Sequence, residues 1–220
     1  QNDIFYCKPY LKYNIVNLYN PIKIENIKNN KNKDEYIKKK YGEYILSVAR
    51  LDYPKDFITL INAFDILVKE KNFNYNLVIV GDGPDRKKIN DYIESKELSK
   101  RIFLVGAQDN VSQFYENSKL FAFSSLSEGL PTVIIEAMSK GIPVVATDSP
   151  YGCKDIIGTD KYGLIVSVGD FKEMANKIKE LLFNKDMYDY YSNQSLKRYN
   201  DFLPENITKS FYEIIGDKNG

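Results

Sequence analysis

The sequence predicts an α/β protein in which helices flank a doubly wound parallel sheet of about six strands. Short apolar runs alternate with helical patterns over residues 44–183. The runs are apolar at nearly every position, as expected for strands that helices cover on both faces. The segments between them carry apolar residues at helical spacing. Ligands of such sheets bind beyond the C-terminal ends of the strands, so polar residues that follow a strand are the first candidates for a site.

Six apolar runs have the length and composition of buried strands. They are YILSVAR (44–50), NLVIVG (76–81), IFLVG (102–106), LFAFSS (120–125), PVVAT (143–147) and GLIVSV (163–168). A shorter strand-like run, YNIVNLYNP, covers residues 13–21 and ends at a proline. The Lys/Asn-rich residues 28–40 are typical of a solvated linker or the edge of a helix. We therefore expect an N-terminal extension over residues 1–43 and a folded domain over residues 44–220.

The segments between the strands are predicted to be helices. DFITLINAFDILVKEK has a single apolar face, formed by Phe57, Leu60, Ile61, Phe64, Leu67 and Val68. PDRKKINDYIESKEL begins with a proline, which suits a first helical turn. Further helical patterns are NVSQFYENS, PTVIIEAMSK and DFKEMANKIKELLFN, and two more segments follow Asp186.

Composition excludes several classes of function. The 31 Lys and Arg residues against 30 Asp and Glu residues leave a net charge of +1, which gives no general attraction for nucleic acid. The sequence contains no histidine, which removes Ser-His-Asp and Cys-His triads and most zinc sites, so no metal site is predicted. Cys7 and Cys153 form no disulfide framework, which favours a reducing, cytoplasmic compartment. No apolar run approaches the roughly 18 residues that span a bilayer, and no signal peptide opens the sequence.

Two cations follow the first central strand. Arg50 ends the run YILSVAR, and Lys55 lies in the loop before the next helix. Two cations beside a helix N-terminus could bind an anion, and they could equally be ordinary surface charges. Farther on, Gly81 and Gly83 begin a dinucleotide fingerprint that Asp82 and Pro84 do not continue, so a tight strand-to-helix turn explains them adequately.

The stretch SEGLPTVIIEAMSKGIPVV, residues 127–145, predicts an anion-binding helix N-terminus. Gly129 supplies a flexible turn, and Pro131 suits the first helical position. The backbone N–H groups near Leu130, Thr132 and Val133 would then be free to bind a diphosphate.

Two carboxylates flank this helix N-terminus. Glu128 precedes the helix, and Glu136 is about five residues into it, roughly 7–8 Å along the axis. They could bind hydroxyl groups of two sugars on either side of a diphosphate. The alternative for Glu136 is a snorkelling or salt-bridged acid on an amphipathic helix, because an unpaired buried carboxylate is costly.

The segment SLSEGLPTVIIEAMSKGIPVVATD resembles the Glu-x7-Glu signature of retaining glycosyltransferases of family 4, which have the two-Rossmann-domain GT-B architecture. The similarity continues in order through ILSVARLDYPKDFITLINAF, LVIVGDGPDRKKI, IFLVGAQDNVSQFYENSKLFAFSS and YGLIVSVGDFKEMANKI. It covers about residues 44–183. The resemblance implies that residues 44–220 are the Rossmann-like, nucleotide-sugar-binding domain.

The resemblance also implies roles for individual residues. Arg50 and Lys55 match the basic pair that holds the donor diphosphate, and Glu128 matches the acid close to the transferred sugar, as nucleophile or as electrostatic stabiliser. Glu136 matches the acid that binds the ribose hydroxyls, and Gln108 lies in the loop whose backbone meets the base. No cofactor is expected. The substrate would be a nucleotide diphosphate sugar, with a UDP-sugar as the expected donor.

Relatives of this type carry an N-terminal domain that binds the acceptor, and about 43 residues before the first central strand are too few for one. We therefore expect a donor-binding half that alone is inactive or weakly active. The full enzyme would move a hexose or amino-sugar to a glycan or lipid-linked acceptor, with peripheral contact at the cytoplasmic face of a membrane. The alternatives are a nucleotide-sugar epimerase of similar architecture and a non-catalytic nucleotide-sugar-binding module; a nicotinamide-dependent dehydrogenase is disfavoured.

Overall fold

A computed structural model describes residues 18–22, 31–150 and 152–216. Its centre is a six-stranded sheet in the order β3-β2-β1-β4-β5-β6, in which every neighbouring pair is parallel. The strands are β1 Tyr44–Val48, β2 Asn76–Val80, β3 Ile102–Gly106, β4 Leu120–Phe123, β5 Val144–Thr147 and β6 Leu164–Val166. Each lies within one of the six predicted runs, and the doubly wound α/β prediction is confirmed.

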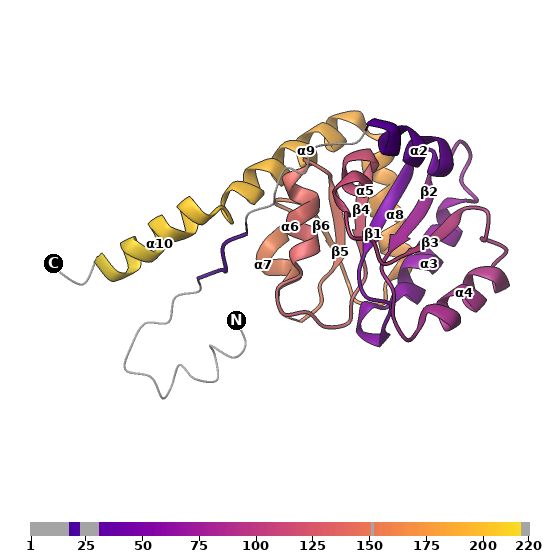
Figure 1. Ribbon diagram of the computed structural model, residues 1–220, viewed down its shortest axis with the longest axis horizontal. Coiled ribbons are helices and arrows are strands. Elements are labelled where there is room, and N and C mark those ends of the chain that lie inside the picture. The colour runs from indigo at the N-terminus through magenta and orange to yellow at the C-terminus, as the bar shows by residue number, and fades with distance from the viewer. Residues whose placement is uncertain (1–17, 23–30, 151, 217–220) are drawn as a thin grey trace.

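Helices cover both faces of the sheet (Figure 1). A short 3-10 turn, Tyr53–Lys55, follows β1. The α-helices are α2 Lys31–Tyr41, α3 Phe57–Leu67, α4 Arg86–Ser95, α5 Ser112–Asn117, α6 Thr132–Ser139, α7 Cys153–Ile157, α8 Phe171–Phe183, α9 Lys185–Asn200 and α10 Pro204–Gly216.

Alternating side chains divide the core into two layers. In β1, Ile45 belongs to the layer that contains α3, α4 and α8, whereas Leu46 belongs to the layer that contains α2, α5, α6 and α7 on the opposite face. Both side chains are at most 1% exposed. Burial of both faces explains why the strands read as continuous apolar runs instead of alternating ones.

The sheet reverses its winding direction between β1 and β4. These two strands are neighbours, although β2 and β3 come between them in the sequence. The loops that leave β1 and β4 are therefore followed by helices on opposite faces of the sheet, which opens a crevice at the C-terminal ends of these strands. Arg50 and Lys55 lie in the loop after β1, Glu128 lies in the loop after β4, and Glu136 lies on the helix that follows, α6 Thr132–Ser139.

The N-terminal region differs from the expectation in two respects. The Lys-rich residues predicted to be a linker or helix edge include α2, whose Ile37 and Tyr41 are 2% and 4% exposed. Both side chains belong to the buried apolar cluster that contains residues of β1, β4 and α5, so they pack the helix against the domain. Of the strand-like run 13–21, residues 13–17 lie outside the described residues, and residues 18–21 form no strand. Cys7 also lies outside them.

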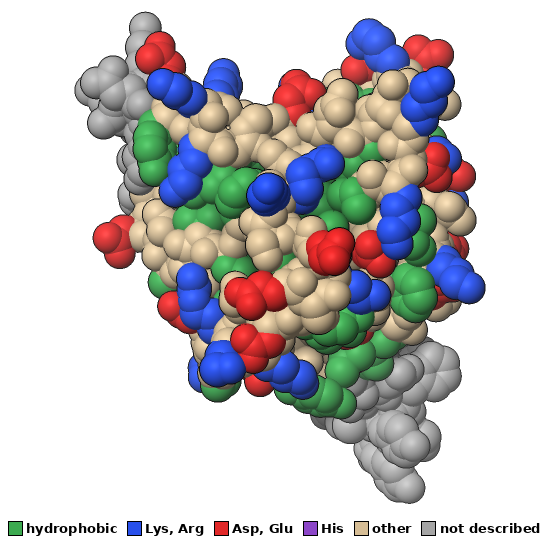
Figure 2. Space-filling model, turned by 90° about the vertical axis from the view of Figure 1, so that its right-hand side faces the viewer, with side chains coloured by type: hydrophobic (Ala, Val, Ile, Leu, Met, Phe, Trp, Pro, Cys, Tyr) green, Lys and Arg blue, Asp and Glu red, His purple; other side chains and the backbone are tan. Residues whose placement is uncertain are grey.

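The C-terminal helices extend beyond the sheet. Figure 1 shows α9 along the edge of the domain and α10 running away from it. Phe211, Tyr212 and Ile215 of α10 are 44%, 63% and 47% exposed. None of the helices in the described ranges combines the length and apolar character that crossing a membrane requires. On the face seen in Figure 2, acidic and basic side chains are interspersed rather than segregated by sign.

Candidate active site

Hydrogen bonds join the loop after β1 to the loop after β4. The Ser125 hydroxyl and the Leu126 amide both donate to the carbonyl of Pro54, at 2.6 and 2.8 Å. The Ser124 hydroxyl donates to the carbonyl of Asp56 at 2.9 Å. Small hydroxyl residues directly after β4 thus fix the Lys55 loop relative to the next strand of the sheet.

The loop after β5 completes this arrangement. The buried Thr147 hydroxyl donates to the carbonyl of Ser125 and accepts from its amide, both at 2.8 Å. The amide of Glu128 donates to the carbonyl of Pro150 at 3.2 Å. Three loops from adjacent strands therefore hold the backbone on either side of Glu128.

Gly152 allows two of these loops to touch. Its φ is +98°, and a Cβ atom there would lie 1.9 Å from the carbonyl oxygen of Gly129. A side chain at this position is incompatible with both the backbone angle and the available space. Gly129 itself has no neighbour within 4 Å of a built Cβ atom, so its free side faces open space.

The central contact of the site is an ion pair between Lys55 and Glu128. Lys55 Nζ lies 2.5 Å from Glu128 Oε1, and the two side chains are 23% and 9% exposed. The lysine Nζ also lies 5.8 Å from the centroid of the Phe123 ring. Solvent ions screen a largely shielded ion pair less than an exposed one, and the contact gives the lysine a fixed position.

Arg50 is placed differently. Its side chain is 70% exposed, and its Nε lies 3.4 Å from Asp52 Oδ2. The structure thus brings Lys55 to Glu128, whereas Arg50 pairs locally at the end of β1. The predicted shared role of the two cations at a diphosphate stays a prediction.

The helix after Glu128 begins one residue later than predicted. Pro131 is the N-cap residue, with a ψ of 89°, and α6 starts at Thr132. The Ile134 amide donates to the Pro131 carbonyl at 3.0 Å. In the described residues no backbone hydrogen bond uses the amides of Thr132 and Val133, as expected for the first turn of a helix. Leu130 is half-buried and Thr132 is exposed.

Glu136 is the fifth residue of α6, as the sequence predicted. Its neighbours Ile135 and Ala137 are fully buried. Its Oε2 accepts a 3.0 Å hydrogen bond from the hydroxyl of Tyr115. Burial raises the pKa of Glu136 above its ordinary value, and the hydrogen bond from Tyr115 opposes that rise. Within the described residues Glu136 forms no ion pair, and its hydrogen-bond partner is a buried tyrosine, so the salt-bridged alternative is not observed there.

Tyr115 was not among the predicted site residues. It lies 21 positions before Glu136, on α5, and it is 2% exposed. The segment NVSQFYENS was assigned to a helix, but nothing in its pattern indicates which side chain reaches α6. Only the placement of α5 beside α6 brings the two residues together.

The two glycines after β2 allow a close approach of backbones. A Cβ atom at Gly81 would lie 1.9 Å from the carbonyl oxygen of Ala49, and one at Gly83 would lie 2.3 Å from that of Leu51. The Leu51 amide donates to the carbonyl of Asp82 at 3.0 Å. The two glycines therefore allow the loop after β2 to pack against the loop after β1. The sequence predicted a tight turn for them but not this contact between loops.

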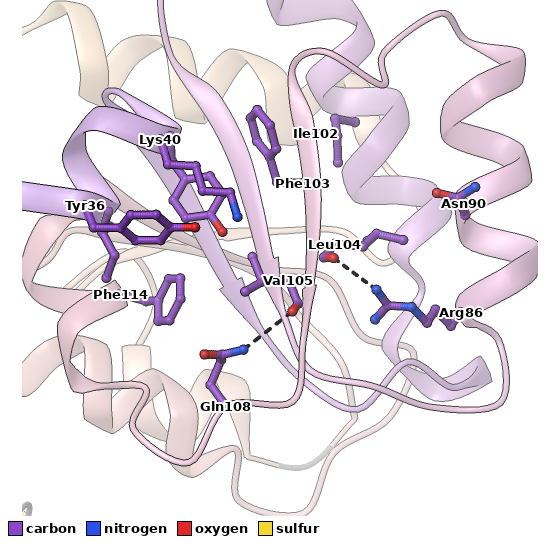
Figure 3. Close-up of a pocket in the computed structure, with 12 residues that line it drawn as sticks. Tyr36, Lys40, Arg86, Asn90, Ile102, Phe103, Leu104, Val105, Gln108 and Phe114 are labelled. Atoms are coloured by element: carbon purple, nitrogen blue, oxygen red, sulfur yellow. Dashed lines mark hydrogen bonds between the residues drawn. The ribbon is translucent and has the colours of Figure 1, made fainter. Parts of the chain in front are cut away.

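Gln108 lies apart from the ion pair, beside the edge strand β3. Its Nε2 donates to the carbonyl of Ala107 at 3.0 Å, and Nη2 of Arg86 donates to that of Leu104 at 3.1 Å. Figure 3 shows these side chains at a pocket of about 450 Å³ that Tyr36, Phe103 and Phe114 also line. Lys55, Glu128 and Glu136 do not line this pocket. Contact of the Gln108 loop with a base stays a prediction.

Comparison with known proteins places this geometry in a family. The family model described as "Glycosyl transferases group 1" matches residues 28–198. The N-acetylgalactosamine-N,N'-diacetylbacillosaminyl-diphospho-undecaprenol 4-alpha-N-acetylgalactosaminyltransferase of Campylobacter jejuni is 32% identical over 90% of this chain and 52% of its own length. The amylovoran biosynthesis glycosyltransferase AmsD of Erwinia amylovora is 28% identical over 78% of this chain and 47% of its own length. The chain thus spans about half the length of these curated relatives.

Solved structures agree with this comparison. TarM of S. aureus, solved with fondaparinux, alpha-GlcNAc-glycerol and UDP, superposes with a TM-score of 0.78 and 25% identity over 97% of this chain and 42% of its own. HepE of Anabaena, solved with UDP and glucose, superposes with a TM-score of 0.77 over 90% of this chain and 56% of its own; at 20% identity it supports the fold alone. The chain belongs to the group 1 glycosyltransferases (family 4), and its sheet is the Rossmann-like C-terminal domain of their GT-B fold.

Proposed function

We propose that this chain is the donor-binding half of a retaining, metal-independent glycosyltransferase. In this proposal it binds a nucleotide diphosphate sugar, with a UDP-sugar as the expected donor. The complete enzyme transfers a hexose or amino-sugar to a glycan or a lipid-linked saccharide. The observation that carries the proposal is the shielded Lys55–Glu128 pair beside the N-terminus of α6, at the point where the sheet reverses its winding.

The residues of this site suit the three parts of such a donor. Lys55 and the free amides of the first turn of α6 would hold the diphosphate, with Arg50 able to swing in from its exposed position. Glu136 would accept hydrogen bonds from the ribose hydroxyls. Glu128 would lie next to the transferred sugar and stabilise the positive charge that develops on its ring.

The leaving group needs this positive environment. In the transfer, the bond between the anomeric carbon and the phosphate oxygen breaks, and a bond to an acceptor hydroxyl oxygen forms on the same face of the sugar. The nucleoside diphosphate departs with the electron pair of the broken bond, and the proton of the acceptor hydroxyl passes to the departing phosphate oxygen. Fixed positive groups at that phosphate stabilise the charge that accumulates there.

The relatives support the class of donor but leave the acceptor open. TarM was solved with UDP, and the Campylobacter relative is named for transfer to a lipid diphosphate-linked saccharide. These properties belong to those proteins. For this chain they make UDP-sugars the first donors to test and lipid-linked saccharides the first acceptors.

Calorimetry with UDP, GDP and ADP tests the proposal, with Lys55→Gln as the diagnostic variant. We expect UDP to bind, and Lys55→Gln to weaken it about tenfold to a hundredfold, because the variant loses a charged hydrogen bond worth about 1.5–3 kcal/mol. Lys140→Gln is the matched control, since Lys140 forms a similarly shielded 2.7 Å pair with Glu116 outside the site. If no nucleoside diphosphate bound, or if both variants lost UDP affinity equally, the proposal would fail.

A further inference from the structure

Tyr115 is a buried hydroxyl group directed at a site residue. Its side chain lies on α5, is 2% exposed and donates to Glu136 Oε2 at 3.0 Å. The carbonyl oxygen of Val133 lies 3.3 Å from the same hydroxyl. A phenol has a single proton, and the carboxylate is both the nearer and the more strongly accepting partner. The proton is therefore directed at Glu136.

The surroundings of Tyr115 hold it in one position. Its ring lies 5.7 Å from that of Phe121, measured between centroids, and its backbone carbonyl accepts a 2.8 Å hydrogen bond from the Ser118 hydroxyl. Burial raises the pKa of the phenol well above its ordinary value, so it remains a donor throughout the physiological range. A fixed donor of this kind restricts the orientation of the carboxylate that it contacts.

The hydrogen bond leaves Glu136 with acceptor capacity to spare. A carboxylate has two oxygens and about four lone-pair sites, of which Tyr115 occupies one. Among the described residues no other donor reaches this carboxylate. The free Oε1 and the second lone pair of Oε2 can thus accept from two adjacent hydroxyl groups, and their direction is set by the tyrosine.

We propose that Tyr115 is a positioning residue, which orients Glu136 so that its carboxylate recognises the vicinal diol of a ribose. This inference rests on the proposed function, because it assigns to Glu136 a nucleoside diphosphate as ligand. Tyr115 does not touch the ligand. It acts by holding Glu136, so its removal should affect only ligands that carry the diol.

The test compares UDP with 2′,3′-dideoxy-UDP by calorimetry on the 220-residue chain, using the wild type and Tyr115→Phe. We expect the variant to bind UDP about tenfold more weakly, a change of about 1.4 kcal/mol, and to bind the dideoxy analogue as well as the wild type does. Tyr44→Phe is the matched control: Tyr44 is fully buried, and its hydroxyl donates to the carbonyl of Phe114 at 2.7 Å. This control should lose thermal stability and keep both affinities.

The outcomes separate the inference from the function on which it rests. If Tyr115→Phe bound UDP like the wild type, or lost affinity for UDP and the dideoxy analogue equally, the positioning role would be wrong while donor binding stood. If the wild type bound neither nucleotide, the proposed function itself would be contradicted. A selective loss for UDP is the result that only a diol-directed role of Tyr115 predicts.

Discussion

Replacing Glu128 by glutamine should change nucleotide binding and sugar transfer in opposite directions. In the free chain, Glu128 Oε1 is paired with Lys55 Nζ at 2.5 Å. An arriving diphosphate must compete for that lysine and also approach the carboxylate, which carries charge of the same sign. The Glu128→Gln variant removes both obstacles while it keeps the size of the side chain.

The structure sets the scale of this effect. Two unit charges 4 Å apart interact by about 4 kcal/mol at an effective dielectric constant of about 20. Desolvation offsets much of that interaction, so we expect a net gain of about 1–2 kcal/mol, or about fivefold to thirtyfold tighter binding of UDP. Because Lys55 is 23% exposed and can reach water, the cost in folding stability should be about 1 kcal/mol.

Calorimetry and thermal unfolding measure the two quantities separately. Glu116→Gln is the control, because its 2.7 Å pair with Lys140 has side chains that are 21% and 16% exposed. It should lose similar stability and keep the wild-type affinity for UDP. In the complete enzyme, Glu128→Gln should lower the transfer rate by about 10²–10³, as expected for loss of a charge-stabilising group. Weaker binding of UDP by Glu128→Gln would refute the competition between Glu128 and the diphosphate.

Three further predictions concern the architecture around the site. Gly152→Ala should destabilise the fold by more than about 3 kcal/mol and abolish UDP binding, because its Cβ atom would lie 1.9 Å from the carbonyl oxygen of Gly129. The control is Gly169→Ala, at a φ of +79° with no atom within 4 Å of the added Cβ, which should cost only about 1 kcal/mol. Equal melting temperatures for the two variants would contradict the predicted clash at Gly152. Burial raises the pKa of the Cys153 thiol from its ordinary value of 9.0 to about 12. The native chain should therefore resist a maleimide reagent at this residue until it unfolds, as mass spectrometry of the labelled peptide would measure. With the folded pKa above the unfolded one, the thiol's contribution to stability is complete below pH 9.0 and is lost as the pH rises toward 12; Cys153→Ala should reduce that alkaline loss, and an unchanged pH profile would count against it.

The sheet could be predicted from the sequence because each strand is buried on both faces. Such strands appear as uninterrupted apolar runs, and all six were located. The helix α7 was missed because it has five residues and lies between Gly152 and Gly158. The Lys-rich composition around α2 concealed the two residues, Ile37 and Tyr41, that fix it to the core.

The part of the site formed by Lys55 and Glu128 could be predicted because of where the two residues lie relative to the strands. Lys55 and Glu128 are 73 positions apart, yet both follow the ends of strands that are neighbours at a reversal of the sheet. The order of the strands therefore brings the two residues together, whatever the conformation of their side chains. The contact between Tyr115 and Glu136 depends on how α5 packs beside α6, and the close approach at Gly152 depends on the path of two loops. Neither leaves a periodic signal in the sequence.

A crystal structure of the chain bound to UDP would decide where the nucleotide binds. We expect the diphosphate within hydrogen-bond distance of Lys55 Nζ and of the first amides of α6, with the ribose hydroxyls on Glu136. A UDP molecule bound elsewhere, with Lys55 still paired to Glu128 and the N-terminus of α6 unoccupied, would contradict this expectation.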